Sequence, residues 1–153
     1  MLVGLPASGK STWREKFTDL NQSAFVYSTD DMVEAYASLD GSTYDETFKR
    51  VIDGVTGNMN VWLSTVIARK QWAIWDQTNL TVNSRRKKLA RFGNDYFKTA
   101  VYFPVIDVVQ WINRLQRPGK TIPVDVLLKM SADLVPPTLD EGFDAIIEID
   151  TFQ

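Results

Sequence analysis

The sequence predicts a three-layer α/β fold with a parallel sheet of about five strands and a helical lid. Short apolar runs alternate with helical segments along the chain, which is typical of strand–helix–strand units. A glycine-rich loop at residues 4–11 lies between an apolar run and a helical stretch. The 153 residues, 44% hydrophobic and 24% charged, fit one globular domain covering residues 1–153.

The predicted strands are short, continuous apolar runs, as expected for strands that are covered on both faces. Repeated strand–helix alternation implies right-handed crossovers, and it places a ligand site at the carboxyl ends of the strands. The five strands are expected at residues 1–4, 24–28, 72–76, 99–103 and 145–149.

Helices are predicted between and after these strands. The clearest is the segment 44–70, where apolar residues recur at three- and four-residue steps. Gly54 and Gly57 interrupt it, either as a small-residue contact between packed helices or as a close approach to a substrate. The other helices are expected at residues 9–19, from about 30, at 82–94, at 106–115 and from Pro123, a residue favoured at the first helical position.

The loop Gly4-Leu5-Pro6-Ala7-Ser8-Gly9-Lys10-Ser11 has the complete G-x-x-x-x-G-K-S pattern of a phosphate-binding loop. Unpaired backbone N–H groups at a helix start point at phosphate oxygens, and Lys10 adds a positive charge toward the β- and γ-phosphates. The Ser11 hydroxyl is a ligand for Mg²⁺. The loop therefore predicts ATP, or another nucleoside triphosphate, with Mg²⁺. The expected nucleotide contacts are Gly4, Ala7, Ser8, Gly9, Lys10, Ser11 and Thr12.

The residue types that are missing restrict the chemistry. The chain has no cysteine and no histidine, which excludes disulfides, thiol nucleophiles and a His-based triad. A general base must then be Asp or Glu, with Lys or Tyr as distant possibilities. No apolar run approaches the ~20 residues of a membrane span, so no membrane partner is expected. No cleavable signal pattern precedes the loop, and the short first strand leaves room for a few residues upstream of Met1.

Acidic residues follow two predicted strands. Asp30 and Asp31 come after the second strand, where either Thr29 or Asp30 caps the next helix, or Asp30 accepts a proton from an acceptor hydroxyl. Asp76 ends the third strand and is a candidate second contact of the Mg²⁺ shell, or else a turn-forming residue. The Thr78 and Asn79 that follow are candidates to hydrogen-bond the phosphate loop or to orient an acceptor.

Basic residues concentrate in one part of the chain. Residues 77–124 carry nine basic and two acidic side chains, a net charge of +7, while the rest of the chain carries −9. This distribution indicates either solvated helix faces or a basic wall for a polyanion. Arg85 and Arg86 are candidates to face the cleft. Arg114 and Arg117 are candidate nucleotide contacts, in or beside a basic lid predicted at about 114–123 that closes over the nucleotide. The alternative is an ordinary exposed loop.

The chain resembles the kinase domain of phage-type polynucleotide 5′-hydroxyl kinases, within the P-loop kinase superfamily. The similar segments are GLPASGKSTW, STDD, YDETFKRVIDGVTGNM, WDQTNL, SRR, NRLQRPGKTIPVDVLLKM and PPTLDEGFD. The resemblance implies an ATP-dependent kinase that acts on DNA or RNA, and a phage protein working in the host cytoplasm. It implies Lys10 and Ser11 as phosphate and Mg²⁺ contacts, Asp30 as the general base, and Arg117 as the lid arginine that stabilises the transferring phosphoryl.

One position departs from that family. The family has an acceptor-binding arginine three residues after the catalytic aspartate, and this chain has Val33 there. A neutral side chain makes no bidentate phosphate contact. Either Arg50 or Arg85 replaces it, or the acceptor differs. The alternatives are a hydroxymethylpyrimidine base within DNA, a small-molecule acceptor, or a nucleotide-dependent switch without transfer activity.

Overall fold

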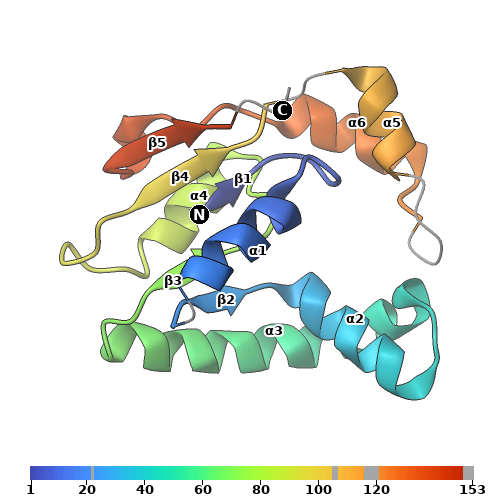
Figure 1. The fold of residues 1–153 in the computed structure, drawn as a ribbon, viewed down its shortest axis with the longest axis horizontal. Helices are drawn as coiled ribbons and strands as arrows, with labels where there is room; N and C mark the ends of the chain where they lie inside the picture. The colour runs from blue at the N-terminus through green and yellow to red at the C-terminus, as the bar shows by residue number, and fades with distance from the viewer. Residues whose placement is uncertain (22, 105–106, 116–120, 150–153) are drawn as a thin grey trace.

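The structure, a computed structural model, describes residues 1–21, 23–104, 107–115 and 121–149. Its elements alternate along the chain as the sequence predicts (Figure 1). The strands are β1 (Leu2–Val3), β2 (Phe25–Tyr27), β3 (Ala73–Trp75), β4 (Thr99–Tyr102) and β5 (Ala145–Glu148). The helices are α1 (Lys10–Leu20), α2 (Thr29–Asp40), α3 (Tyr44–Ala68), α4 (Val82–Leu89), α5 (Val108–Leu115) and α6 (Val124–Asp133), with a short 3₁₀ turn η1 (Leu139–Glu141).

All five predicted strands are present, and all of their pairings are parallel. Their hydrogen bonds divide them into a three-stranded sheet, β1-β4-β5, and a two-stranded sheet, β2-β3, rather than one ladder of five. The chain leaves β1 after two residues, and the next amide, that of Gly4, donates to the Thr78 carbonyl beyond the end of β3 at 3.0 Å. This bond keeps β1 beside β3 without extending the ladder.

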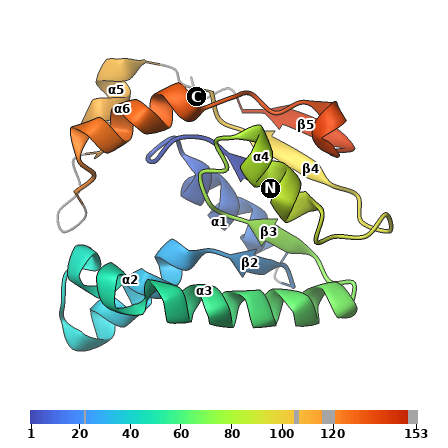
Figure 2. The same cartoon turned by 180° about the vertical axis from the view of Figure 1, so that it is seen from behind.

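Alternate residues of the strands face opposite layers. On one face, Leu2, Ile74 and Val101 pack together with Trp13 and Phe17 of α1. The opposite face packs against α3 and α4, through a cluster around Leu89 and another around Met59. Figures 1 and 2 show α1 on one side of the strands and α4 on the other, which confirms the predicted three layers.

Several helix ends differ from the sequence-based expectation. The cap of α2 is Ser28, whose hydroxyl accepts from the Asp31 amide at 3.2 Å, so neither Thr29 nor Asp30 caps it. Helix α4 ends at Leu89, five residues earlier than predicted, because the amides of Arg91 and Phe92 bond three residues back as the chain tightens. Pro123 precedes the first residue of α6.

The two glycines of α3 do not pack against another helix. A Cβ atom at Gly54 or Gly57 would meet no atom of the described residues within 4 Å, so the predicted small-residue contact is wrong. No helix in the described segments combines the length and apolar character needed to cross a membrane. Half of the predicted lid, residues 116–120, lies outside the described residues, between α5 and α6 in the sequence.

Candidate nucleotide and acceptor site

The phosphate loop connects β1 to α1 in a conformation that requires its glycines. Ala7 and Gly9 both have positive φ, 59° and 98°, which turn successive backbone N–H groups toward one concave side. A Cβ atom at Gly4 would lie 2.9 Å from the Phe103 Cβ and 2.9 Å from the Ser8 Oγ, so only glycine fits there. Helix α1 follows directly, with no side-chain cap on its first amides.

Two polar groups of the loop suit a phosphate. The Lys10 Nζ is buried and donates to the carbonyls of Gly4 and Leu5 at 2.9 and 2.6 Å, so its charge lies inside the loop. Among the described residues, the Ser8 Oγ is buried and makes no hydrogen bond to the protein. A buried hydroxyl without a partner is costly, and a bound phosphate oxygen would satisfy it. Ser11 and Thr12 lie exposed on the first turn of α1.

The two acids predicted from the second strand lie in the first turn of α2 but differ in their partners. The Tyr44 hydroxyl, at the start of α3, donates to the Asp30 Oδ1 at 2.8 Å. Asp31 instead forms an ion pair with Arg14 of α1, with Nη1 and Oδ2 2.6 Å apart. Both carboxylates follow the carboxyl end of β2, at the edge where the topology predicts a ligand.

Asp76 lies at the adjacent strand end and shares Arg14 with Asp31. The Arg14 Nη1 is 2.7 Å from the Asp76 Oδ2, and the Asp76 side chain is only 9% exposed. Burial raises the pKa of Asp76 above its ordinary value, while the charges of Arg14 and then Lys10 oppose that rise. Arg14 therefore joins α1, α2 and the end of β3 at one point.

These residues fit a magnesium ion that also uses ligands from a nucleotide. The described residues contain no group of three or more acidic side chains that could hold a metal by themselves. Mg²⁺ typically takes one or two protein oxygens and completes its shell with phosphates and water. The Ser11 hydroxyl in the loop motif and the Asp76 carboxylate at the end of β3 are the candidate protein oxygens.

The segment after β3 supports the phosphate loop. The Thr78 carbonyl accepts from the Gly4 amide, which agrees with one of the two alternatives for Thr78, a bond to the loop. Asn79 is 2% exposed with φ of 51°, and its amide nitrogen donates to the Leu2 and Gln77 carbonyls at 2.6 and 3.1 Å. Asn79 is thus buried beneath the loop, and its predicted role in orienting an acceptor is wrong.

Arg85 is also buried rather than turned to the cleft, which corrects its predicted role in substrate binding. Its side chain is fully buried, and its Nε and Nη2 donate to the two carboxylate oxygens of Glu141 at 2.6 and 2.7 Å. Its Nη1 donates to the carbonyls of Asn79, Leu80 and Val135. Because the side chain is fully buried and all three of its nitrogens bind protein groups, it does not reach an acceptor phosphate. Arg86 is exposed, and its Nη2 lies 3.8 Å from the Asp140 Oδ2.

The candidates to replace the family arginine lie elsewhere, and a different arginine lies at the site. Val33 is fully buried, and Arg50 pairs with Asp40 near the far end of α2. The basic side chain that pairs with the acid next to Asp30 is Arg14, which the sequence reasoning missed. Its signal was available, since Arg14 lies four residues after Lys10 and so on the same helix face.

Helix α5 reaches the phosphate loop. The Trp111 Nε1 donates to the Pro6 carbonyl at 2.8 Å, a contact that sequence reasoning did not foresee. Arg114 lies exposed one turn later on α5, and Arg117 lies outside the described residues. The helix that leads into the predicted lid is therefore attached to the phosphate loop.

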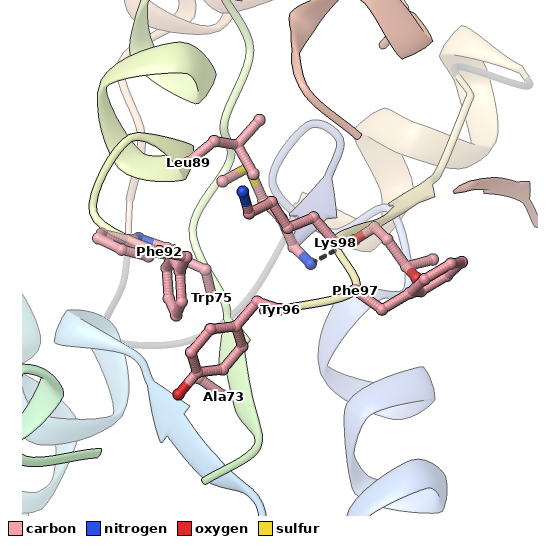
Figure 3. A pocket seen from close by; sticks show the side chains of 9 residues that line it. Ala73, Trp75, Leu89, Phe92, Tyr96, Phe97 and Lys98 are labelled. Carbon is pink, nitrogen blue, oxygen red and sulfur yellow. Dashed lines mark hydrogen bonds between the residues drawn. The ribbon is translucent and has the colours of Figure 1, made fainter. Parts of the chain in front are cut away.

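A small hollow lies at the other end of the strands. Its volume is about 70 Å³, and Figure 3 shows the rings of Trp75, Phe92 and Tyr96 among its lining, with Lys98 nearby. Ala73 and Thr99, the first residues of β3 and β4, also line it. Because the strands are parallel, this hollow is at the amino ends, away from the phosphate loop.

The fold and the loop define a P-loop nucleotide-binding domain. Residues 1–137 of the chain match an AAA domain family, which covers most of the 153 residues. The chain therefore belongs to this family, whose members are P-loop domains of the kinase type.

Proposed function

We propose that this protein transfers the γ-phosphate of ATP, or of another nucleoside triphosphate, to a hydroxyl group of a nucleic acid. The favoured acceptor is the 5′-hydroxyl of a DNA or RNA strand. The observation that carries the proposal is the position of Asp30, on the first turn of α2 and next to an acid that Arg14 ties to α1. A carboxylate beside a phosphate loop is the arrangement that phosphoryl transfer to a hydroxyl requires.

Each residue has a distinct part in this proposal. The backbone of the loop and Lys10 hold the triphosphate, and Asp30 takes the proton from the attacking hydroxyl. Ser11 and Asp76 hold the ion, and bound Mg²⁺ would neutralise charge on the phosphates. Arg114 and Arg117 would approach the nucleotide from α5 and the lid, since Trp111 attaches α5 to the loop.

A second acceptor is supported by a specific observation. Val33 is buried, and Arg50 and Arg85 are both engaged in ion pairs away from Asp30. An acceptor with no phosphate at that position would not need the missing arginine. A hydroxymethyl group on a pyrimidine base of DNA is such an acceptor, and its base would have to leave the stack to reach Asp30.

The test supplies γ-labelled ATP and Mg²⁺ with two acceptors in parallel. One is an oligonucleotide with a 5′-hydroxyl, and the other is a duplex with 5′-phosphates and internal hydroxymethylpyrimidines. Label on the first supports the favoured acceptor, and label only on the second supports the alternative. Lys10→Met is the control that should transfer no label. No labelled product from either acceptor, with intact ATP binding, would contradict the proposal and favour a small-molecule kinase or a switch.

A further inference from the structure

We propose that Tyr44 is a positioning residue for Asp30: its hydroxyl holds the carboxylate in the orientation that accepts a proton from the acceptor. This inference rests on the proposed role of Asp30 as the general base. It adds a residue from a different helix to the site, since Tyr44 begins α3 whereas Asp30 lies in the first turn of α2.

The contact is direct and joins two segments. The Tyr44 Oη and the Asp30 Oδ1 are 2.8 Å apart, across 14 residues of chain. This length is typical of a hydroxyl that donates to a carboxylate. A hydrogen bond to one oxygen limits rotation of the carboxylate about its χ2 torsion, which is otherwise broad. Fixing that rotation presents the acid to the acceptor in one orientation.

The tyrosine itself is held in place. Thr43 caps α3 in a reciprocal capping box, in which its hydroxyl accepts from the Glu46 amide and its own amide donates to the Glu46 carboxylate. The Tyr44 ring is half-buried and packs at a tilt against Phe48, with centroids 5.8 Å apart. The hydroxyl therefore approaches Asp30 from a fixed helix start.

Tyr44 remains a donor under all working conditions. Burial, and then the negative charge of Asp30, raise the pKa of Tyr44 above its ordinary value. A protonated phenol keeps its hydrogen for the carboxylate and does not compete for the acceptor's proton. In this proposal Tyr44 acts on the reaction through Asp30.

The same contact is not needed to keep α2 and α3 together. The two helices are also joined by the Asp40–Arg50 ion pair. In the connection between them, Ser42 bonds to Asp40 of α2 through its amide and to Thr47 of α3 through its hydroxyl. Val33 and Ala37 of α2 and Val55 and Met59 of α3 are buried in the interior. Replacing Tyr44 with phenylalanine keeps the ring and removes only the hydroxyl, so the packing should survive.

The experiment compares Tyr44→Phe with the wild type, using whichever acceptor takes label in the two-acceptor assay. We expect kcat to fall about three- to tenfold, the effect of one lost hydrogen bond to a charged group. The KM for ATP and the thermal midpoint should stay unchanged. Tyr36→Phe is the matched control, because Tyr36 lies on α2, is 39% exposed, and should leave all three values unchanged.

A double-mutant cycle with Asp30→Asn separates positioning from structure. If Tyr44 acts through Asp30, adding Tyr44→Phe to Asp30→Asn should cause no further loss of kcat. The role of Tyr44 would be overturned if Tyr44→Phe lowered kcat by the same factor in Asp30→Asn as in the wild type. It would also be overturned if Tyr44→Phe alone had a normal kcat while Asp30→Asn was impaired. Either result would leave the proposed function intact. Normal turnover in Asp30→Asn would instead overturn both.

Discussion

Two arginines of this protein each connect distant segments through carboxylates, and their surroundings differ. Arg85 and Glu141 are both buried, and the guanidinium also binds three backbone carbonyls. Arg14 is 11% exposed and uses a single nitrogen, Nη1, for its bonds to Asp31 and Asp76. All three guanidinium nitrogens of Arg85 donate to protein groups in the interior, which is typical of a permanent connection.

The difference separates a structural cluster from a functional one. Arg85 joins α4, the segment after β3 and the region around η1, so that it supports the phosphate loop from beneath through Asn79 and Leu2. Arg14 lies where a ligand is expected, and one of its partners, Asp31, is 48% exposed. The ion pairs of Arg14 can be replaced by contacts with a ligand when it binds, whereas the buried contacts of Arg85 cannot.

The largest effect should come from breaking the buried cluster. We expect Arg85→Met to lower the free energy of unfolding by about 3–5 kcal/mol, because Glu141 keeps a buried charge without its partner. Urea denaturation followed by circular dichroism measures it. The double variant Arg85→Met/Glu141→Leu should recover part of the loss but not all of it, since three carbonyls still lack their donor. A change below about 1 kcal/mol in Arg85→Met would contradict the structural role.

The next effect concerns turnover rather than stability. We expect Asp30→Asn to keep ATP affinity and the thermal midpoint, and to lower kcat by a factor of at least ~10² through loss of the proton acceptor. Asn retains an oxygen that can accept from Tyr44, so the contact with α3 is preserved. Asp45→Asn, an exposed acid in the first turn of α3, is the control and should have normal kcat. Unchanged turnover in Asp30→Asn would remove this residue from the mechanism.

Two of the carboxylates that pair with these arginines, Glu141 and Asp76, should respond to acid in opposite ways. Burial favours a higher pKa for Glu141, but the hydrogen bonds from Arg85 and Thr138 outweigh it and leave the pKa lowered. The pKa of Asp76 is raised. A lowered pKa contributes stability above pH 4.5 that is lost as pH falls through the folded-state value, with a slope of at most about 1.4 kcal/mol per pH unit. A raised pKa works against that loss, because the folded state then takes up the proton first.

Unfolding free energies measured between about pH 3 and 7 test the directions of both pKa shifts, the lowered one of Glu141 and the raised one of Asp76. In Glu141→Gln the acid-induced loss should be shallower than in the wild type. In Asp76→Asn it should be steeper, because the proton uptake that favours the folded state is gone. The same slope in all three proteins would show that neither carboxylate has a shifted pKa.

Sequence reasoning succeeded where the signal is local or topological. The five strands, α3 and the phosphate loop follow from apolar spacing and from one motif. The positions of Asp30 and Asp76 at neighbouring strand ends follow from the parallel topology. These features require no knowledge of which distant side chains meet.

It failed where the partner is far away in the sequence. Arg85 lies in a basic run that looks like a solvated face, and its burial depends on Glu141, 56 residues later. Asn79 depends on the Leu2 carbonyl, 77 residues earlier. The spacing from Lys10 gives the helix face of Arg14, but not its two acidic partners, which lie on other elements. Long-range pairing of charges is set by tertiary packing, which composition and periodicity do not encode.

The smallest expected effect distinguishes the exchangeable arginine from the fixed one. Arg14 pairs with Asp76, and in the proposed site Mg²⁺ would use the same carboxylate, so removing the guanidinium would remove a competitor close to the ion. We expect Arg14→Gln to lower the Mg²⁺ concentration for half-maximal nucleotide binding by about two- to fivefold, measured with a fluorescent ATP analogue. Lys16→Gln, an exposed cation on the same helix, should leave it unchanged. A lower Mg²⁺ concentration for half-maximal binding in Arg14→Gln, but not in Lys16→Gln, would support the exchange of Arg14 for Mg²⁺ at Asp76. A higher Mg²⁺ concentration would mean that Arg14 orders Asp76 for the ion and is as fixed as Arg85.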